Sequence, residues 1–303
     1  MRAAHIDIEP VSKAICRELL LIWRFIKNDI WDTVIPCFVT FFTAWIYCKK
    51  PINELPLLLL FSIGYTLFYI LTFCVANQIN SVDEDRINKP DRPLVTGLIS
   101  ASMAGKRLII YNILFDIIAV LLHLFWLALA WQFITLLLCR WGCSRHWITK
   151  NLVCISLGTI TLLAAEWEIV DRLQPNVWSF IIVLSVWAGF GLPLQDMRDQ
   201  EGDKVMERKT LPLEIGDRMA RIMLSIYFLI VSPLIYCCAI LTQIDLTRLF
   251  FNKPVIIILI IETLWHWWVA VRLHLYKTPR DDDKTYHLFV YLFIVTIPLI
   301  CII

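Results

Sequence analysis

The chain has 303 residues, of which 59% are hydrophobic and 18% are charged, and its mean hydropathy is +0.68. Soluble domains contain about 45–50% apolar and about 25% charged residues, so this composition excludes a soluble enzyme, a disordered chain and a small disulfide-rich secreted module. The formal net charge of +2 gives no indication of a nucleic-acid partner, and no motif indicates a protein partner. We therefore expect an all-α polytopic membrane protein, built as one domain over residues 1–303.

Nine apolar runs are long enough to be membrane-spanning helices, because about 20 apolar residues cross the hydrocarbon core of a bilayer. Residues 1–29 are expected to form a cytosolic and interfacial segment, since apolar and basic side chains share helical spacing over 11–28. The stretch 107–139 is too long for one span, and we expect a turn at His123 to divide it. The runs are 30–48, 55–76, 106–122, 124–140, 150–167, 177–195, 219–241, 254–273 and 286–303.

Basic residues are distributed unevenly between the two sides of these spans. If the N-terminus is cytosolic, 23 of the 28 Lys and Arg residues fall on its side, which also holds the loops 77–105 and 196–218. Cytosolic loops of membrane proteins carry an excess of Lys and Arg. The sequence therefore predicts an integral multi-pass protein of the endoplasmic reticulum, with both of these long loops in the cytosol.

Two acidic clusters continue the expected cytosolic ends of two spans. In the first, Asn77, Ser81 and Asp85 lie four residues apart, which places them on one face of a helix, with Asp83 nearby. The second has the same character, with three carboxylates at i, i+3 and i+7: Asp196, Asp199 and Asp203. Basic residues and then a proline follow each cluster, namely Lys89, Arg92 and Pro93 in one and Lys204, Arg208 and Pro212 in the other.

Rows of carboxylates repel one another unless a cation binds between them. Oxygen ligands with few His or Cys residues nearby suit Mg²⁺, which keeps several waters and bridges to phosphate oxygens. The basic residues that follow suit the remaining phosphate charge. We therefore expect a site for a Mg²⁺-bound diphosphate that opens into an apolar interior, as a prenyl diphosphate substrate requires. The expected metal ligands are Asn77, Asp83, Asp85, Asp196, Asp199 and Asp203, and the expected diphosphate ligands are Lys89, Arg92, Lys204 and Arg208.

The two clusters resemble the two signature motifs of the UbiA superfamily of intramembrane prenyltransferases. The resemblance rests on Asn77 with DRINKPDRPL at 85–94, and on the D-x-x-D-x-x-G-D pattern at 196–203. It covers nearly the whole chain and implies nine helices around a central cavity, with the acidic helix ends at its mouth. The carboxylates that it implies for catalysis are Asp85, Asp196, Asp199 and Asp203.

Two positions depart from the usual family pattern. Ser81 stands where the first motif usually has its middle Asp, and Gln195 stands where a Lys often precedes the second motif. Together with WRFIKNDIWDTVIP at 23–36, the altered first motif resembles a fungal branch that includes UbiA-type sesquiterpene (bergamotene) cyclases. The resemblance therefore implies a Mg²⁺-dependent terpene cyclase acting on farnesyl diphosphate. The alternative is a prenyltransferase that transfers the prenyl group to an aromatic acceptor.

Side chains inside the apolar runs supply further candidates. A carbocation needs aromatic faces, and Trp187 and Phe190 precede the second acidic row closely enough to bind the substrate. Their ordinary alternative is a place in the core or the interfacial aromatic belt. Glu262 is a candidate for the base that removes the final proton, or else a hydrogen-bonding partner of a neighbouring helix. A transporter is disfavoured, because transporter sites lie near the bilayer midplane whereas these acids cluster at helix ends.

Overall fold

The computed structural model describes residues 11–241 and 253–302, and the regular structure in this part of the chain is helical. The helices near the N-terminus are α1 (Val11–Ile26), α2 (Ile35–Tyr47), α3 (Leu55–Asn80), α4 (Val82–Asn88), α5 (Ala101–Leu121) and α6 (Phe125–Cys139). They are followed by α7 (Ser156–Val170), α8 (Pro175–Gly191), α9 (Pro193–Arg198), α10 (Gln200–Val205) and α11 (Leu211–Ile215). The last are α12 (Asp217–Ile226), α13 (Ser232–Leu241), α15 (Lys253–Leu275) and α16 (Pro279–Thr296). Single π-helical stretches, η2 (Ile30–Val34), η5 (Ile148–Ile155) and η6 (Tyr227–Val231), join onto α2, α7 and α13.

Each of the nine predicted apolar runs coincides with one of these helical segments. Seven of the helical segments in the described ranges are long and apolar enough to cross a membrane. The remaining two runs correspond to α5 and to the 15-residue α6. The predicted division of 107–139 is confirmed, because His123 adopts a positive φ of 61° between α5 and α6. The all-α membrane architecture is therefore confirmed, with nine as an approximate number of spans.

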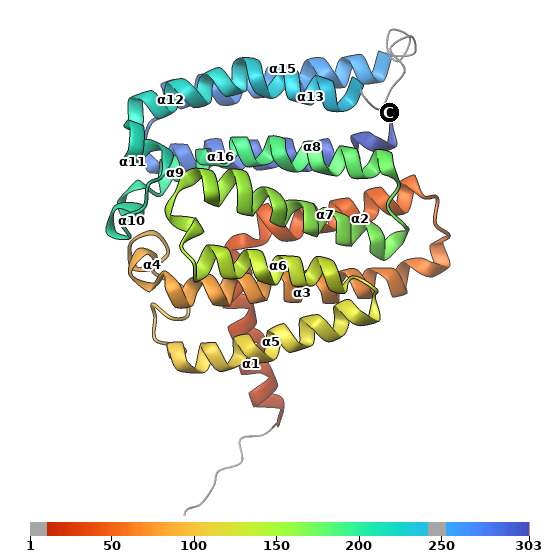
Figure 1. Ribbon diagram of the computed structural model, residues 1–303, viewed down its shortest axis with the longest axis vertical. Helices are drawn as coiled ribbons and strands as arrows, with labels where there is room; N and C mark the ends of the chain where they lie inside the picture. The colour runs from red at the N-terminus through yellow and green to blue at the C-terminus, as the bar shows by residue number, and fades with distance from the viewer. Residues whose placement is uncertain (1–10, 242–252, 303) are drawn as a thin grey trace, which may run out of the picture.

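The long helices lie side by side with their axes in a similar direction (Figure 1). The short helices α4, α9, α10 and α11 gather at one end of this bundle, at the left in Figure 1, where the long helices begin or end. Residues from α2, α3, α6, α7, α8 and α16 surround a central cavity that opens toward this end. The bundle therefore places both acidic clusters at the entrance of an apolar interior.

The predicted N-terminal helix is present as α1, which runs across the direction of the bundle helices (Figure 1). Its Leu21 and Phe25 are buried, and Glu18 accepts hydrogen bonds at 2.9 Å from Arg107 and 2.8 Å from Tyr111 of α5. One face of α1 is thus fixed to the bundle. The first ten residues of the predicted 1–29 segment lie outside the described residues.

Candidate functional site

The two acidic clusters meet at one end of the bundle. Helices α4 and α10 pack directly on each other, and Arg208 forms an ion pair at 2.7 Å with Glu84. Gly202 lies against Asn88 so closely that a Cβ at position 202 would overlap the Asn88 amide. The prediction that loops 77–105 and 196–218 share one side of the protein agrees with this packing. Their location in the cytosol stays a prediction.

Both acidic rows are interrupted rather than continuous helices. Ser81 leaves the helical conformation between α3 and α4, with φ −125° and ψ 28°, and Asp199 does so between α9 and α10, with φ −95° and ψ 8°. The Ser81 hydroxyl donates to the Asn77 carbonyl at 2.8 Å and contacts Asp85 Oδ2 at 3.3 Å, so it links the two parts of the first row. These interruptions change which carboxylates face the cavity.

In the first cluster, a buried arginine folds back onto the last acid of the row. The Arg92 Nη1 donates to Asp85 Oδ1 at 2.7 Å and Oδ2 at 2.9 Å, and both side chains are almost fully buried. Burial raises the pKa of Asp85, although the charge of Arg92 acts in the opposite direction. Arg92 also lies 3.7 Å from Asp29, so one cation serves two carboxylates at the cavity entrance.

The second cluster repeats this arrangement. Arg208 Nη1 donates at 2.9 Å to Asp203 Oδ1, while the buried Oδ2 of Asp203 has no hydrogen-bonding partner. Burial raises the pKa of Asp203 to about 6, although the positive charge of Lys150 acts in the opposite direction. In each cluster, therefore, the arginine that follows the row binds its last carboxylate, as the similar organisation of the two sequences leads one to expect.

Asp196 is fully buried and held by two side chains of the π-helical segment η5. Lys150 Nζ donates to its Oδ1 at 2.7 Å, and Asn151 Nδ2 donates to its Oδ2 at 3.1 Å. Lys150 itself lines the cavity, whereas Asp196 lies behind it. The acid thus neutralises and orients a cation that faces the cavity. In the sequence, Lys150 is distinguished only as a basic residue beside a membrane span.

Asp199 is the member of the second row that lines the cavity. Arg198 Nε donates to its Oδ1 at 3.2 Å, and the same guanidinium forms an ion pair with Asp283 at the start of α16. The Arg198 guanidinium also lies 4.9 Å from the centre of the Tyr286 ring. Because Asp283 and Tyr286 belong to α16, this arginine fixes Asp199 relative to the opposite side of the cavity.

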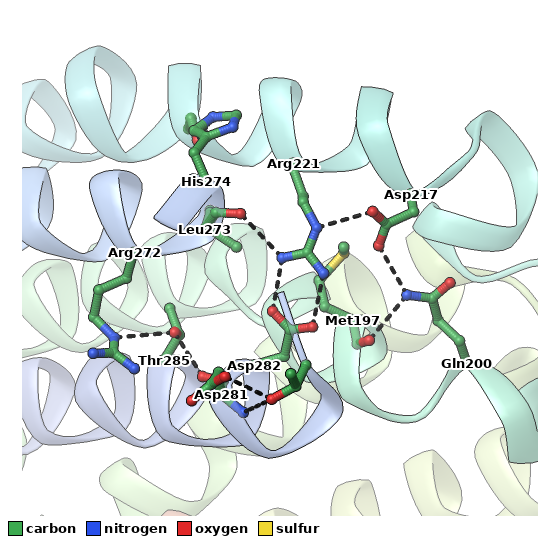
Figure 2. A network of polar contacts seen from close by, with 12 residues as sticks. Met197, Gln200, Asp217, Arg221, Arg272, Leu273, His274, Asp281, Asp282 and Thr285 are labelled. Carbon is green, nitrogen blue, oxygen red and sulfur yellow. Dashed lines mark hydrogen bonds and ion pairs between the residues drawn. The ribbon is translucent and has the colours of Figure 1, made fainter. Parts of the chain in front are cut away.

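A further arginine, Arg221, holds the surrounding helices together outside the cavity (Figure 2). Arg221 of α12 donates two hydrogen bonds of 2.8 Å to Asp282 of α16, one of 3.0 Å to Asp217 and one of 3.1 Å to the Leu273 carbonyl of α15. Gln200 of α10 donates to Asp217 at 3.1 Å. The network therefore connects the segment after Asp199 to three helices of the C-terminal half.

The cavity encloses about 200 Å³, with a polar entrance and an apolar interior. The charged residues that line it are Asp29, Asp32, Glu84, Asp85, Lys89, Arg92, Lys150, Asp199 and Arg208. Its interior is lined by aliphatic side chains, such as Ile70, Leu138, Leu162 and Leu192, and by the aromatic side chains Tyr69, Phe73, Trp131, Tyr286, Phe289 and Phe293. A charged head and a hydrocarbon tail can therefore bind at the same time.

Two aromatic rings stack at the cavity wall. The rings of Tyr69 and Trp131 lie 4.1 Å apart and nearly parallel, at 8°. Tyr69 donates a 2.7 Å hydrogen bond to the Gly158 carbonyl, and Trp131 Nε1 donates to the Tyr69 carbonyl at 2.9 Å. A Cβ at position 158 would overlap the Trp131 ring, so glycine is required there for this close approach. The stack is thus held rigidly by three helices.

The predicted site residues divide into those that line the cavity and those that do not. Asn77, Asp85, Lys89, Arg92, Asp199 and Arg208 line it. Asp196 and Asp203 lie behind the lining, each bound to a basic residue that belongs to it. Asp83 is exposed and pairs with Arg86, and Lys204 lies farther out, in an open hollow that Asp199 also borders.

The structure places the two expected aromatic residues outside this lining. Trp187 is buried between helices, where its Nε1 donates to Ser232 at 2.5 Å and its ring packs on Phe289. Phe190 is 42% exposed and stacks on Tyr227. The cavity instead meets α8 and α9 at Ala188, Leu192 and Gln195, which share a helical face.

Several lining residues were not predicted. Glu84 directly precedes Asp85 but falls outside the four-residue spacing of the first row. Asp29 and Asp32 lie in the stretch WRFIKNDIWDTVIP, where the sequence alone indicates resemblance but no role. Tyr69, Trp131 and Tyr286 come from three helices far apart in the sequence, and each is unremarkable within an apolar run. Only the packing of the helices brings them together.

The donors at the entrance fit a magnesium ion that binds mainly through a substrate. No group of three Asp, Glu, His or Cys side chains within the described ranges is arranged to hold a metal by itself. Mg²⁺ needs only one or two carboxylates when phosphate oxygens and waters complete its octahedron. Asn77, Asp85 and Asp199 offer such oxygens at the cavity, and the unpartnered Oδ2 of Asp203 lies behind them.

The fold and this site define a helical membrane protein whose charged entrance leads into an apolar cavity. The chain belongs to the UbiA prenyltransferase family, whose sequence model matches residues 33–295. Its fold is similar to that of a UbiA homolog from Archaeoglobus fulgidus solved with DMAPP and Mg²⁺. The TM-score is 0.66 at 18% sequence identity, and the match covers 93% of this chain and 99% of that one.

The sequence is also similar to several terpene-forming enzymes. It is 35% identical over 220 residues to somaliensene A/B synthase from Streptomyces somaliensis, covering 72% of this chain and 73% of that protein. It is 34% identical over 284 residues to the diterpene cyclase eriG from Hericium erinaceus, covering 93% and 88%. It is 30% identical over 162 residues to the fumagillin β-trans-bergamotene synthase of Aspergillus fumigatus. This match confirms the resemblance to the branch of bergamotene cyclases. The polyprenyl transferase eriF of Hericium erinaceus is 28% identical over 285 residues.

Proposed function

We propose that this protein is a Mg²⁺-dependent membrane terpene cyclase of secondary metabolism, which ionises farnesyl diphosphate and cyclises it to a sesquiterpene hydrocarbon. The observation that carries this proposal is the cavity itself: a charged entrance continues into an apolar chamber lined by six aromatic side chains. Relatives named as a somaliensene synthase, a diterpene cyclase and a bergamotene synthase support the cyclase class.

The residues at the entrance have separate tasks in this proposal. Asn77, Asp85 and Asp199 would hold Mg²⁺, which supplies charge stabilisation for the departing diphosphate. The cations that line the cavity, Lys89, Arg92, Lys150 and Arg208, bind the phosphate oxygens. Arg92, Lys150 and Arg208 are each held by a carboxylate, so little reorganisation of these three cations is needed when charge develops on the leaving group.

The aromatic interior has the complementary task. Aromatic faces stabilise positive charge without acting as nucleophiles. The stacked Tyr69 and Trp131 rings present such a surface at a fixed position in the cavity wall. The chamber excludes water from the cation, so the double bonds of the substrate attack it intramolecularly, at high effective concentration.

Two alternatives follow from particular relatives. Similarity to a polyprenyl transferase favours, as the second candidate, transfer of the prenyl group to an aromatic acceptor after the same ionisation step. Similarity to a diterpene cyclase over 93% of this chain makes geranylgeranyl diphosphate the alternative substrate within the cyclase class. The proposed location is the endoplasmic reticulum membrane, with the cavity opening to the cytosol.

The test is incubation of membranes containing the protein with farnesyl diphosphate and Mg²⁺ in the absence of an acceptor, followed by gas chromatography of volatile products. A cyclase forms a cyclic hydrocarbon, loses this activity with EDTA and is indifferent to 4-hydroxybenzoate or homogentisate. Parallel incubations with geranylgeranyl diphosphate decide chain length. Product that appears only when a phenolic acceptor is added refutes the cyclase proposal and establishes the transferase.

A further inference from the structure

We propose that Asp32 is the catalytic base that removes the final proton from the cyclised carbocation. This inference rests on the proposed cyclase function and assigns a residue to its last step. Asp32 belongs to neither acidic motif and lies in the π-helical stretch η2 that precedes α2. Single π-helical turns occur frequently at functional sites.

Asp32 lies where the charged entrance meets the apolar interior. It lines the cavity together with Thr33 and Pro36 of the same segment. Tyr286 lines the cavity too, and its hydroxyl donates to Asp32 Oδ2 at 3.1 Å. Phe289 and Phe293 continue the lining inward along α16 from that tyrosine. A carboxylate in this position faces both the space for the hydrocarbon and the route to water.

The ion pairs at the entrance distinguish Asp32 from the other acids. The remaining carboxylates that line the cavity each lie within ion-pair distance of an arginine: Asp29 and Asp85 with Arg92, Glu84 with Arg208, and Asp199 with Arg198. Within residues 11–241 and 253–302, Asp32 is the one lining carboxylate without such an ion pair. Its hydrogen bonds come from two hydroxyl groups, those of Tyr286 and Thr33.

Hydroxyl partners suit a base better than a guanidinium does. A carboxylate in a bidentate pair with arginine is committed as a counter-ion, and protonating it would leave a buried charge unpaired. Asp32 is not the counter-ion of an arginine in the described residues, so protonating it leaves no guanidinium unpaired. Tyr286 keeps its carboxylate oriented, and the cation–π contact of Arg198, at 4.9 Å from the ring, holds Tyr286 in turn.

The proposed step balances without a co-reactant. The C–H bond next to the cationic carbon breaks, and its electron pair forms the new C=C double bond of the hydrocarbon. The proton moves to a carboxylate oxygen of Asp32, which becomes a neutral carboxylic acid. After the hydrocarbon has left, water at the charged entrance takes this proton and restores the carboxylate.

Two other buried acids of the membrane spans, Glu262 and Glu166, lie outside the cavity lining. Glu262, the base candidate from the sequence, accepts a 3.2 Å hydrogen bond from Thr296, and it is absent from the lining. Glu166 is fully buried and accepts hydrogen bonds from Ser62 at 2.6 Å and Thr66 at 2.7 Å. Both therefore act in packing between helices.

The experiment measures diphosphate release and hydrocarbon formation separately, using the full-length protein with farnesyl diphosphate and Mg²⁺. In Asp32→Asn we expect formation of the native hydrocarbon to fall by about 10²-fold, the lower end of the range of about 10²–10⁴ attributed to a general base, with terpene alcohols or earlier olefins in its place. Diphosphate release and its Mg²⁺ dependence should stay close to wild type. Asp32→Glu retains a carboxylate and should keep part of the native product.

Glu262→Gln is the matched control, because it neutralises an intramembrane acid outside the cavity and should leave the product pattern unchanged. An unchanged product pattern in Asp32→Asn overturns the assignment and leaves the cyclase function intact. A parallel loss of diphosphate release with a raised Mg²⁺ requirement also overturns it, since Asp32 would then act on the metal. If the wild-type protein forms hydrocarbon from neither farnesyl diphosphate nor geranylgeranyl diphosphate, the cyclase proposal is refuted, and the assignment of Asp32 as the base is refuted with it.

Discussion

The Arg221–Asp282 pair offers a quantitative test of how the C-terminal helices are held at the site. Both side chains are nearly inaccessible, at 3% and 2% exposure, and the pair is bidentate. In Asp282→Ala the guanidinium loses two of its hydrogen bonds but keeps those to Asp217 and to the Leu273 carbonyl. Removing one partner of a buried pair costs about 3–5 kcal/mol, and the two remaining bonds place our expectation near 3 kcal/mol.

The assay is the free energy of unfolding in mixed detergent micelles. A double variant, Arg221→Met with Asp282→Leu, should recover most of the loss, because it buries neither charge. Asp83→Ala provides the matched control. The Asp83–Arg86 pair is 67% and 63% exposed, so its loss should cost less than about 1 kcal/mol. Our reasoning is refuted if Asp282→Ala costs no more than Asp83→Ala, or if the double variant is as unstable as the single one.

Three further predictions address the site and its orientation. Asp199→Asn should lower turnover by roughly 10²–10³-fold, because it removes one negative charge at the cavity. The variant should stay folded, as judged by size-exclusion chromatography, and near-normal turnover with unchanged Mg²⁺ dependence would exclude Asp199 from the site. Gly158→Ala should displace the Trp131 ring, cost about 1–3 kcal/mol of stability and alter the ratio of products, measured by gas chromatography; an unchanged ratio would show that the stack does not shape the product. Glycosylation acceptor sites inserted into 77–105 and 196–218 should remain unmodified in the endoplasmic reticulum, because both loops carry the excess of basic residues; efficient modification of either would contradict the topology.

The sequence by itself determined the membrane architecture. Backbone polar groups must be satisfied within each spanning segment, so long apolar runs become helices regardless of their neighbours. The turn at His123 is predicted from length, because the apolar stretch 107–139 is too long for a single membrane span. The spacing and composition of the two acidic clusters also indicated the end of the bundle at which the candidate site lies, because short-range patterns place side chains on helix ends directly.

Tertiary structure alone decided which of those side chains reach the cavity. Breaks at Ser81 and Asp199 change the helical phase, so a row that looks continuous in sequence delivers Asp199 to the cavity and turns Asp196 and Asp203 behind it. A buried carboxylate needs a partner, and the partner of Asp196 is Lys150, 46 residues away. No local pattern encodes such a pairing.

The aromatic lining shows the same limit. Trp187 and Phe190 are close to the acidic row in sequence, yet their side chains leave α8 in directions other than that of Ala188, which meets the cavity. Successive residues of a helix are rotated by about 100°, so nearness along the chain does not give direction. The rings that do line the chamber, including Tyr69 and Trp131, come from helices whose contact depends on how the whole bundle packs.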